Sequence, residues 1–511
     1  MKARSLLARL GIRRLEHVSV ARDFSIYSIV NIASLVLLLA TALVLRRTIG
    51  PYLAGVWTAL ELLPTYVAYT HLGTLTAAER ELPFLLGARR PDDFDRLKHT
   101  LFWLTHGLGG VLAAALVVAA FATASRVSQP TFIGLFLYAP ILWAQLVSTY
   151  YIVLYRARKR FVALSGRQGI ANLLKAGLLV AGGYGFGIYG VLVAELAAAL
   201  LFVALLKGSI EERFERRFEP SLLTPLLADG VPMLAGAVAF ELLRGADQIV
   251  ILAQLGPSLL GVYSVTSLVC QGVYYLPNAL STVMYPRFQQ RYGETGSAES
   301  LRRFVELQLH MLADTLLAAI AVLFVALPPV ISRFFPQYID TIAPLRIMLV
   351  GTYFLCLTPP AGQFLLTVHK QRSALLLGLP ATAVAFVAGY VGARRGLVGV
   401  AAGVSAAGLL EFVGLNAYAF AHLEDAARIG RRLMTIIATA GVVMLIVLLV
   451  ERYVPPGPPV IAVLGGWRLA AVAVLTVPLM FRAVRRLRSL ARVVPDGLNS
   501  TDLVDNAGVS H

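Results

Sequence analysis

The chain has 511 residues, of which 58% are hydrophobic and 14% are charged, and its formal net charge at pH 7 is +17. Soluble globular domains carry roughly 25% charged residues, so this composition excludes a soluble protein. Apolar stretches of about 18 to 24 residues recur along the sequence, each long enough to cross a hydrocarbon core of about 30 Å as a helix. The sequence therefore predicts an all-α, polytopic membrane protein.

About fourteen transmembrane helices can be marked by hydropathy. They are expected near residues 24–45, 55–77, 100–124, 132–155, 168–187, 190–206, 230–253, 260–284, 305–327, 344–367, 374–391, 397–421, 433–450 and 460–481. The N-terminus, the even-numbered loops and the C-terminal tail hold 34 of the 45 Lys and Arg residues, whereas the other loops hold 7. Cytoplasmic loops carry such an excess, so we expect a multi-pass protein of the cytoplasmic (inner) membrane with both termini in the cytoplasm. The positive charge then reports topology and contact with anionic lipid, and nucleic acid is not an expected partner.

Two pairs of similar segments indicate an internal duplication. Residues 49–57 read IGPYLAGVW and residues 255–263 read LGPSLLGVY, while GIYGVLV from Gly187 resembles GLVGVAA from Gly396. The offsets are 206 and 209 residues, with six spans between the members of a pair. An even number of spans makes the two copies parallel. We therefore predict two parallel six-helix lobes around a central cavity, with two C-terminal helices outside the repeat.

This organisation divides the chain into six segments. They are a basic cytoplasmic N-terminus (1–23), an N-terminal six-helix lobe (24–206), a cytoplasmic crossover (207–229), a C-terminal six-helix lobe (230–424), the last two spans (425–483) and a disordered cytoplasmic tail (484–511). Within the crossover, residues 211–219 read EERFERRFE, with two phenylalanines four residues apart among charges. This pattern is typical of an amphipathic helix at the inner membrane surface.

A polar stripe follows the duplicated turn in each copy. The stripes consist of Glu61, Thr65, Tyr69 and Thr76 in the first copy and of Ser267, Gln271, Tyr275, Asn278 and Thr282 in the second. Their spacing places each set on one helical face, and the 206-residue offset makes the two faces equivalent. Polar stripes in lipid would be costly, so we expect both to face the protein interior or a water-filled cavity. The alternative is interhelical hydrogen bonding in a packed bundle.

The span at 230–253 carries three charged residues near its middle. Glu241, Arg244 and Asp247 lie within an arc of about 120°, with Gln248 beside them. A charge at the bilayer centre costs at least about 2.5 kcal/mol, so this cluster needs partners or water. One hypothesis is a substrate site in which the planar guanidinium of Arg244 binds an anionic diphosphate. The alternative is a Glu241–Arg244 pair that fastens helices together.

Three further groups are candidates for ion coupling. His310 and Asp314 share a face with Glu306 near the cytoplasmic end of the span at 305–327, where a histidine could exchange a proton. Lys175 lies inside the span at 168–187 and could face a cavity or snorkel to the cytoplasm. Polar residues in the first turns of a span are alternatively interfacial.

Four other charges lie in or beside the predicted spans. Glu195 and Glu411 are expected to be buried, and no role is assigned to either. Arg46 and Arg47 end the first span on the outside. We expect these two arginines to anchor the end of the span at the membrane surface rather than to contact substrate.

The sequence resembles the polysaccharide flippase family, the Wzx-type O-antigen and polysaccharide transporters of the multidrug/oligosaccharidyl-lipid/polysaccharide (MOP) exporter superfamily. The residues that carry the resemblance are the turn IGPYLAGVW, GVPMLAG from Gly230, GADQIVILAQLGPSLLGVYSV from Gly245 and LPNALSTVMYPR from Leu276. The resemblance covers roughly residues 20–425. It implies a two-lobed fold that moves polyprenyl-diphosphate-linked oligosaccharide from the inner to the outer leaflet by alternating access. The implied partners are this glycan lipid and membrane lipid, with a glycan polymerase or glycosyltransferase as candidate protein partners.

Other functions stay open alongside this resemblance. The number of spans also resembles the lipid II flippases, and a cation-coupled multidrug exporter of the same superfamily is a further alternative. A membrane glycosyltransferase or glycan polymerase is disfavoured because the outside loops are short and nearly free of carboxylates. The sequence has no GxxxxGK[ST] phosphate loop and no HExxH zinc motif. We therefore expect a transporter rather than an enzyme, with no cofactor and no metal.

Overall fold

The computed structural model describes residues 12–208, 215, 217–423, 426–455 and 466–493. Every regular element in these ranges is helical, which confirms the all-α prediction. Contacts divide the chain into two compact units. The first comprises Met1–Val238 with Leu255–Val265, and the second comprises Ala239–Gln254 with Thr266–His511.

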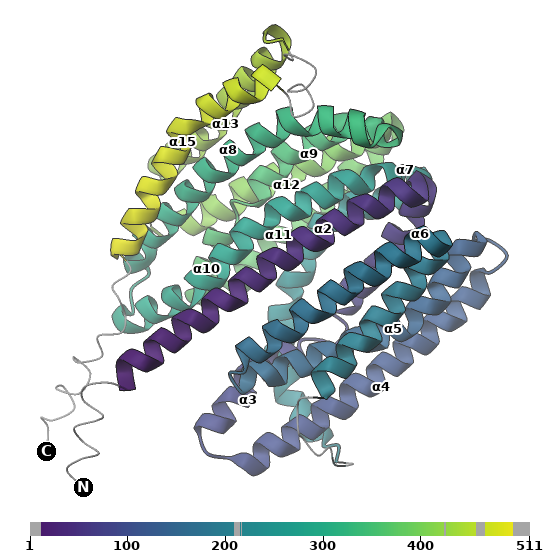
Figure 1. The fold of residues 1–511 in the computed structure, drawn as a ribbon. Helices are drawn as coiled ribbons and strands as arrows, with labels where there is room; N and C mark the ends of the chain where they lie inside the picture. The colour runs from purple at the N-terminus through teal and green to yellow at the C-terminus, as the bar shows by residue number, and fades with distance from the viewer. Residues whose placement is uncertain (1–11, 209–214, 216, 424–425, 456–465, 494–511) are drawn as a thin grey trace, which may run out of the picture. The chain divides into compact units, whose positions relative to one another are not determined.

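Long helices packed side by side form the first unit (Figure 1). Its elements are α2 (Ile12–Val67), α3 (Thr74–Gly87), α4 (Pro91–Thr123), α5 (Gln129–Ala157), α6 (Phe161–Lys207), the 3-10 helix η1 (Pro220–Leu222) and parts of α7 (Leu223–Thr295). Helix α5 packs against α4, α6 and α2, and α2 also packs against α6. Tyr150 and Tyr155 of α5 are buried in the core, and their hydroxyls donate to the carbonyls of Lys98 at 3.1 Å and Leu206 at 3.0 Å. These bonds satisfy the phenol groups in an apolar interior.

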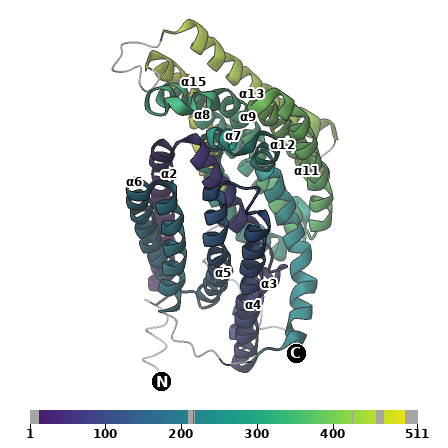
Figure 2. The ribbon, with the colours of Figure 1, turned by 90° about the vertical axis from the view of Figure 1, so that its right-hand side faces the viewer.

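The second unit contains the rest of α7 and the helices that follow it. Its further elements are α8 (Arg302–Phe334), α9 (Ile342–Leu355), α10 (Pro359–Thr367), α11 (Gln371–Gly392), α12 (Gly396–Phe420), α13 (Ala426–Tyr453) and α15 (Gly466–Val493), with the 3-10 helices η2 (Ala298–Leu301), η3 (Pro336–Thr341) and η4 (Ala393–Arg395). Helix α12 packs against α11 and α9. Helices α13 and α15 both pack against α8 (Figure 1, Figure 2).

Ten helices or joined helices of the described residues are long and apolar enough to cross a membrane. Four of them are interrupted by a non-helical glycine, and each interruption separates two predicted spans. The glycines are Gly50 in α2, Gly187 in α6, Gly256 in α7 and Gly396 at the start of α12. The chain is therefore a multi-pass helical membrane protein, and the total of fourteen spans stays a prediction.

The duplicated segments share their backbone conformation. Gly50 and Gly256 have φ values of 79° and 81° and ψ values of 169° and 177°. Gly187 and Gly396 have φ values of 58° and 68° and ψ values of −137° and −155°. Only glycine adopts such positive-φ conformations at little cost. The two sequence matches thus mark two pairs of equivalent turns.

The helices that follow the turns at Gly50 and Gly256 pack against each other within the first unit. The Cα of Gly55 lies against the backbone of Pro257 and Gly261, and Gly261 lies reciprocally against Pro51 and Gly55. Neither glycine leaves room for a side chain. This is the small-residue packing that lets membrane helices approach closely.

Arg46 supports the same turn from inside the protein. Its Nε donates to Oγ of Ser264 at 2.7 Å, and its Nη1 donates to the carbonyl of Ala42 at 3.1 Å. Its guanidinium lies over the ring of Trp57, 5.2 Å from the centroid, and the side chain is buried. The arginine is therefore fixed by protein contacts at the end of the first predicted span.

The predicted span 55–77 is wrong beyond Val67, where α2 ends. Pro64 removes one backbone donor from the last turns of the helix, and the chain then leaves the helix in a turn that includes Gly73 with a φ of 80°. Tyr69 lies in this turn and Thr76 lies in α3. The first stripe therefore does not continue as a single helical face.

The tail predicted to be disordered from residue 484 begins as helix, because α15 continues to Val493. Residues 494–511 lie outside the described residues. Most of the amphipathic helix predicted at 211–219 also lies outside them, since 209–214 and 216 are not described.

The end of the crossover is fixed to α4 by an ion-paired carboxylate. Nε of Arg96 donates to Glu219 at 3.0 Å, and Nε of Arg217 donates to it at 2.6 Å. These hydrogen bonds, with that of Arg96 the strongest, lower the pKa of the Glu219 carboxyl to about 2. The carboxylate therefore stays ionised, and the link persists, throughout the physiological pH range.

The turn inside α6 gives a stability prediction. Gly190 packs against the backbone of Gly182, so the change Gly190→Ala forces a methyl group into that carbonyl. We expect the free energy of unfolding to fall by about 1–3 kcal/mol. Gly177→Ala, on the same helix but with nothing within 4 Å, should be neutral or stabilising. Thermal unfolding of both variants in one detergent measures the difference, and equal midpoints would contradict the close packing.

Candidate functional site

The arginine of the α7 cluster lies in the second unit and is partly exposed. Nη1 of Arg244 donates to Oε2 of Glu241 at 3.2 Å, and each side chain is 21% exposed. The guanidinium lies over the ring of Tyr274, 4.1 Å from the centroid, and 6.0 Å from the centroid of Phe240. The ion pair and the cation–π contacts together stabilise a permanent charge inside a membrane helix.

The hydrogen-bonding capacity of Arg244 is not exhausted by Glu241. Its Nε is buried and has no hydrogen-bond partner within the described ranges. Asp247 is buried, and its Oδ1 accepts the backbone N–H of Gln248 at 2.8 Å. The structure thus contains the Glu241–Arg244 ion pair that the packing hypothesis requires. It also leaves one N–H donor of the guanidinium without a partner among the described residues, as the hypothesis of diphosphate binding requires.

The second polar stripe continues along α7 on the C-terminal side of this cluster. Gln271 and Asn278 are exposed, Tyr275 is half-buried and Ser267 is buried. Neither the Gln271 nor the Asn278 side chain forms a hydrogen bond within the part of the chain that the structure describes. These amides are therefore not used to pack the second unit. That the two stripes face each other across a central cavity stays a prediction.

A second charged cluster lies in the first unit. Nζ of Lys175 lies 2.8 Å from Oε2 of Glu195, and the carboxylate is 9% exposed against 30% for the lysine side chain. Glu61 of α2 lies within electrostatic range of both groups and of Arg46. Lys175 forms its ion pair with Glu195, and the Glu61 carboxylate forms no ion pair with any described residue. Thr65 is exposed on the next turn of α2, and its hydroxyl donates to the carbonyl of Glu61 at 3.0 Å.

The turn at Gly187 builds this cluster. It reverses the direction of α6, so that Lys175 before the turn and Glu195 after it come together. Gly182 and Gly190 let the two halves approach closely. Sequence reasoning placed Lys175 and Glu195 in separate spans and did not pair them. The small residues Gly182 and Gly190, which let the two predicted spans approach closely, are the signal that could have indicated the facing sides.

The ion-coupling candidates on α8 are held by arginines. Asp314 forms ion pairs with Arg486 and, at 3.5 Å, with Arg482 of α15. Nε2 of His310 lies 3.4 Å from Nη1 of Arg432 of α13, and its carbonyl accepts a hydrogen bond from Arg486 at 2.9 Å. These contacts join α8 to α13 and α15. They favour a structural role over proton exchange.

Glu411 of α12 is the other buried acid that the sequence indicated. It is 5% exposed, and its Oε2 has no hydrogen-bond partner among the described residues. The backbone of Gly378 in α11 lies beside it. Within the described ranges, no group of three His, Cys, Asp or Glu side chains is placed to hold a metal ion.

The fold is that of known membrane transporters. A lipid II flippase, MurJ, in an inward closed conformation matches with a TM-score of 0.70 at 13% identity, over 90% of this chain and 99% of that one. An inward-facing multidrug resistance MATE family transporter of the MOP superfamily matches with a TM-score of 0.63 at 15% identity, over 80% and 96% of the two chains. No curated protein matches the sequence.

A family model described as "Polysaccharide biosynthesis protein" matches residues 86–343, just over half of the chain. This range includes both charged clusters except Glu61. The resemblance found in the sequence is thereby confirmed: the chain belongs to the polysaccharide biosynthesis protein family and has the fold of the MOP transporters.

Proposed function

We propose that this protein is a flippase that moves polyprenyl-diphosphate-linked oligosaccharide from the inner to the outer leaflet of the cytoplasmic membrane by alternating access. The glycan would be an O-antigen, capsule or exopolysaccharide unit, and both termini would be cytoplasmic. The family and the transporter fold support transport rather than catalysis. The observation that carries the substrate class is the partly exposed guanidinium of Arg244, which is paired only with a carboxylate of its own helix, whereas Arg346 is paired with an acid of another helix.

Arg244 has the properties that a diphosphate requires. Its guanidinium is protonated at every physiological pH and donates hydrogen bonds in a rigid fork that matches phosphate oxygens. Tyr274 orients the plane of the guanidinium, and Glu241 keeps the charge balanced while the site is empty. A diphosphate would displace or share the contact with Glu241. The carboxylate would then promote release by competing for the same nitrogen atoms.

The polar stripe suits the other end of the substrate. Oligosaccharides present many hydroxyl groups, which exchange hydrogen bonds with amides and phenols. Gln271, Tyr275 and Asn278 offer such groups within about two turns of one helix. Thr65 and Tyr69 would offer similar groups in the first unit. We propose that these residues line the path of the glycan while Arg244 holds the diphosphate.

Two alternatives have specific support. A lipid II type peptidoglycan precursor carries the same diphosphate, so Arg244 would serve it equally well. A cation-coupled multidrug exporter would use the acidic cluster of Glu61, Lys175 and Glu195 but has no need of a phosphate-binding cation. A requirement for Arg244 in transport would therefore distinguish either flippase from a multidrug exporter. The length of the transported glycan would distinguish the two kinds of flippase from each other.

Ion coupling is best supported at the cluster in the first unit. Lys175 is paired with Glu195, and the Glu61 carboxylate on the neighbouring helix forms no ion pair with any described residue, so its negative charge is not neutralised by a direct contact. A proton or a monovalent cation would neutralise it, and a charge change at a buried site can bias one conformation over another. We therefore propose Glu61, Lys175 and Glu195 as the coupling site, in preference to His310 and Asp314.

The substrate proposal predicts that Arg244→Lys accumulates normally in the membrane but loses transport by roughly tenfold or more, because a point charge replaces the two-pronged donor. The matched control is Arg346→Lys. Arg346 is also an intramembrane arginine of the second unit, paired with Glu451 and stacked on Phe324 at 4.8 Å. The measurement is transport per inserted molecule. Wild-type transport by Arg244→Lys would defeat the assignment.

A double variant distinguishes this role from packing. If the pair only fastened helices, removing both charges in Arg244→Gln with Glu241→Gln would restore accumulation and full activity. The proposal expects accumulation without transport. The comparison needs only quantified membrane protein and the same transport assay.

The coupling proposal predicts that Glu61→Gln transports at a rate that no longer responds to an imposed ion gradient. Lys175→Met should be unstable by about 3 kcal/mol, because it leaves Glu195 buried without a partner. Adding Glu195→Leu to Lys175→Met should recover the stability, since an apolar pair replaces an ion pair, but not the response to the gradient. A gradient response retained by both Glu61→Gln and the double variant would contradict the proposal.

A further inference from the structure

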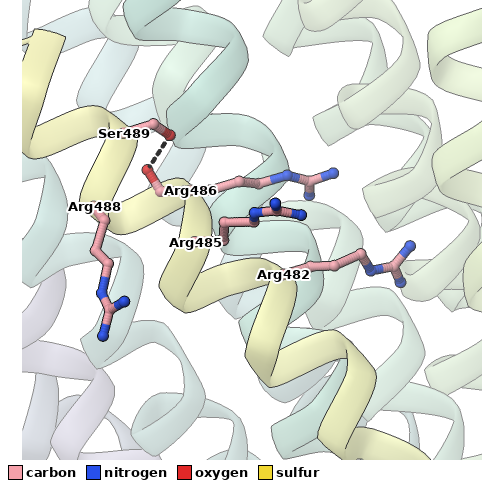
Figure 3. A pocket seen from close by; sticks show the side chains of 5 residues that line it. All are labelled: Arg482, Arg485, Arg486, Arg488 and Ser489. Atoms are coloured by element: carbon pink, nitrogen blue, oxygen red, sulfur yellow. Dashed lines mark hydrogen bonds between the residues drawn. The ribbon is translucent and has the colours of Figure 1, made fainter.

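Four arginines line a pocket of about 650 Å³ near the C-terminal end of α15 (Figure 3). The lining residues are Arg482, Arg485, Arg486, Arg488 and Ser489. In Figure 3 the side chains of Arg482, Arg485 and Arg486 extend to the same side of the helix, and Arg488 points away from them. The hydroxyl of Ser489 donates to the carbonyl of Arg486 at 2.8 Å. The pocket is therefore strongly basic.

Asp314 neutralises only part of this charge. Its carboxylate pairs with Arg486 and Arg482, which fixes α15 to α8. Arg485 and Arg488 are exposed and form no ion pair or hydrogen bond with any described residue. The nearby acid Glu306 is already paired with Arg302 and Arg432. No described residue thus competes with an anionic ligand for these two guanidinium groups.

An apolar groove of about 470 Å³ adjoins the basic pocket. Its lining includes Val477, Met480, Phe481 and Val484, and Arg485 and Arg488 line both cavities. Phe481 is 68% exposed. The same two arginines therefore stand where a charged pocket meets a hydrocarbon surface.

We propose that this surface binds an anionic glycerophospholipid of the inner leaflet. The phosphate would contact Arg485 and Arg488, and an acyl chain would lie in the groove along α15. Basic pockets between membrane helices on the cytoplasmic side bind anionic headgroups in this way. A soluble anion would make no use of the groove. The residues that line this site differ from those proposed to bind the transported substrate, so the proposal does not rest on the proposed function.

The test is native mass spectrometry of the full-length protein in a neutral detergent, titrated with palmitoyl-oleoyl phosphatidylglycerol or phosphatidylcholine. The unmodified chain should retain phosphatidylglycerol preferentially. Arg485→Gln with Arg488→Gln should weaken its binding roughly thirtyfold, since each basic residue near an anionic headgroup contributes about a fivefold gain. Arg482 and Arg486 stay unchanged in this variant, so the contact of α15 with Asp314 is kept.

The matched control is Arg287→Gln with Arg372→Gln, which removes two exposed arginines of the same unit far along the chain from α15. It should bind phosphatidylglycerol like the unmodified protein. An equal loss in the control would mean that only the general positive surface matters. Equal retention of both lipids by the unmodified chain would overturn the proposal, as would equal binding of soluble glycerophosphoglycerol, which lacks the acyl chains.

Discussion

A charge inside a hydrocarbon core must be balanced by a nearby group, and this constraint governs how the helices are joined. Every charge that the sequence places deep in a described span, apart from Glu411, has an opposite charge or a hydrogen-bonding group beside it. The ion pairs are Lys175–Glu195, Arg244–Glu241, Arg346–Glu451 and Asp314–Arg486. The pairs Arg346–Glu451 and Asp314–Arg486 join one helix to another, whereas Arg244 and Glu241 are three residues apart on the same helix. We propose that Arg244 binds the substrate and that the cluster of Glu61, Lys175 and Glu195 binds an ion.

The duplication supplies a common frame, and the two copies differ in the charges they carry. The shared elements are the turns at Gly50 and Gly256, which have nearly identical backbone angles. With the same offset of 206 residues, Arg244 corresponds to Leu38, and Glu61 corresponds to Ser267. Glu61 of the first copy and Arg244 of the second therefore have no charged counterpart at the equivalent position of the other copy. This asymmetry fits a division of work in which the first unit senses an ion and the second binds the anionic substrate.

Hydropathy was sufficient to predict an all-α membrane fold. The repeat was sufficient to predict the paired turns, because a turn with positive φ requires a glycine that can be recognised in both copies of the sequence. The end of α2 at Val67 was missed because its turn lies inside a continuous apolar stretch. The reversal at Gly187 was predicted as the boundary between two spans, but the pairing of Lys175 with Glu195 was missed because hydropathy does not show which faces of two neighbouring spans meet. Tyr274 was missed as a partner of Arg244 because an aromatic residue in a span is usually packing. Local patterns thus predicted elements, whereas contacts between elements required the structure.

The most direct test of the account is translocation of a polyprenyl-diphosphate-linked oligosaccharide in vesicles reconstituted with the purified protein. Substrate placed in one leaflet should become accessible to an impermeant reagent at the other leaflet, at a rate well above that of protein-free vesicles. An imposed ion gradient should change that rate, because we propose that Glu61, which forms no ion pair with a described residue, takes up the coupling ion. A rate equal to that of protein-free vesicles, with the protein correctly inserted, would contradict the central claim.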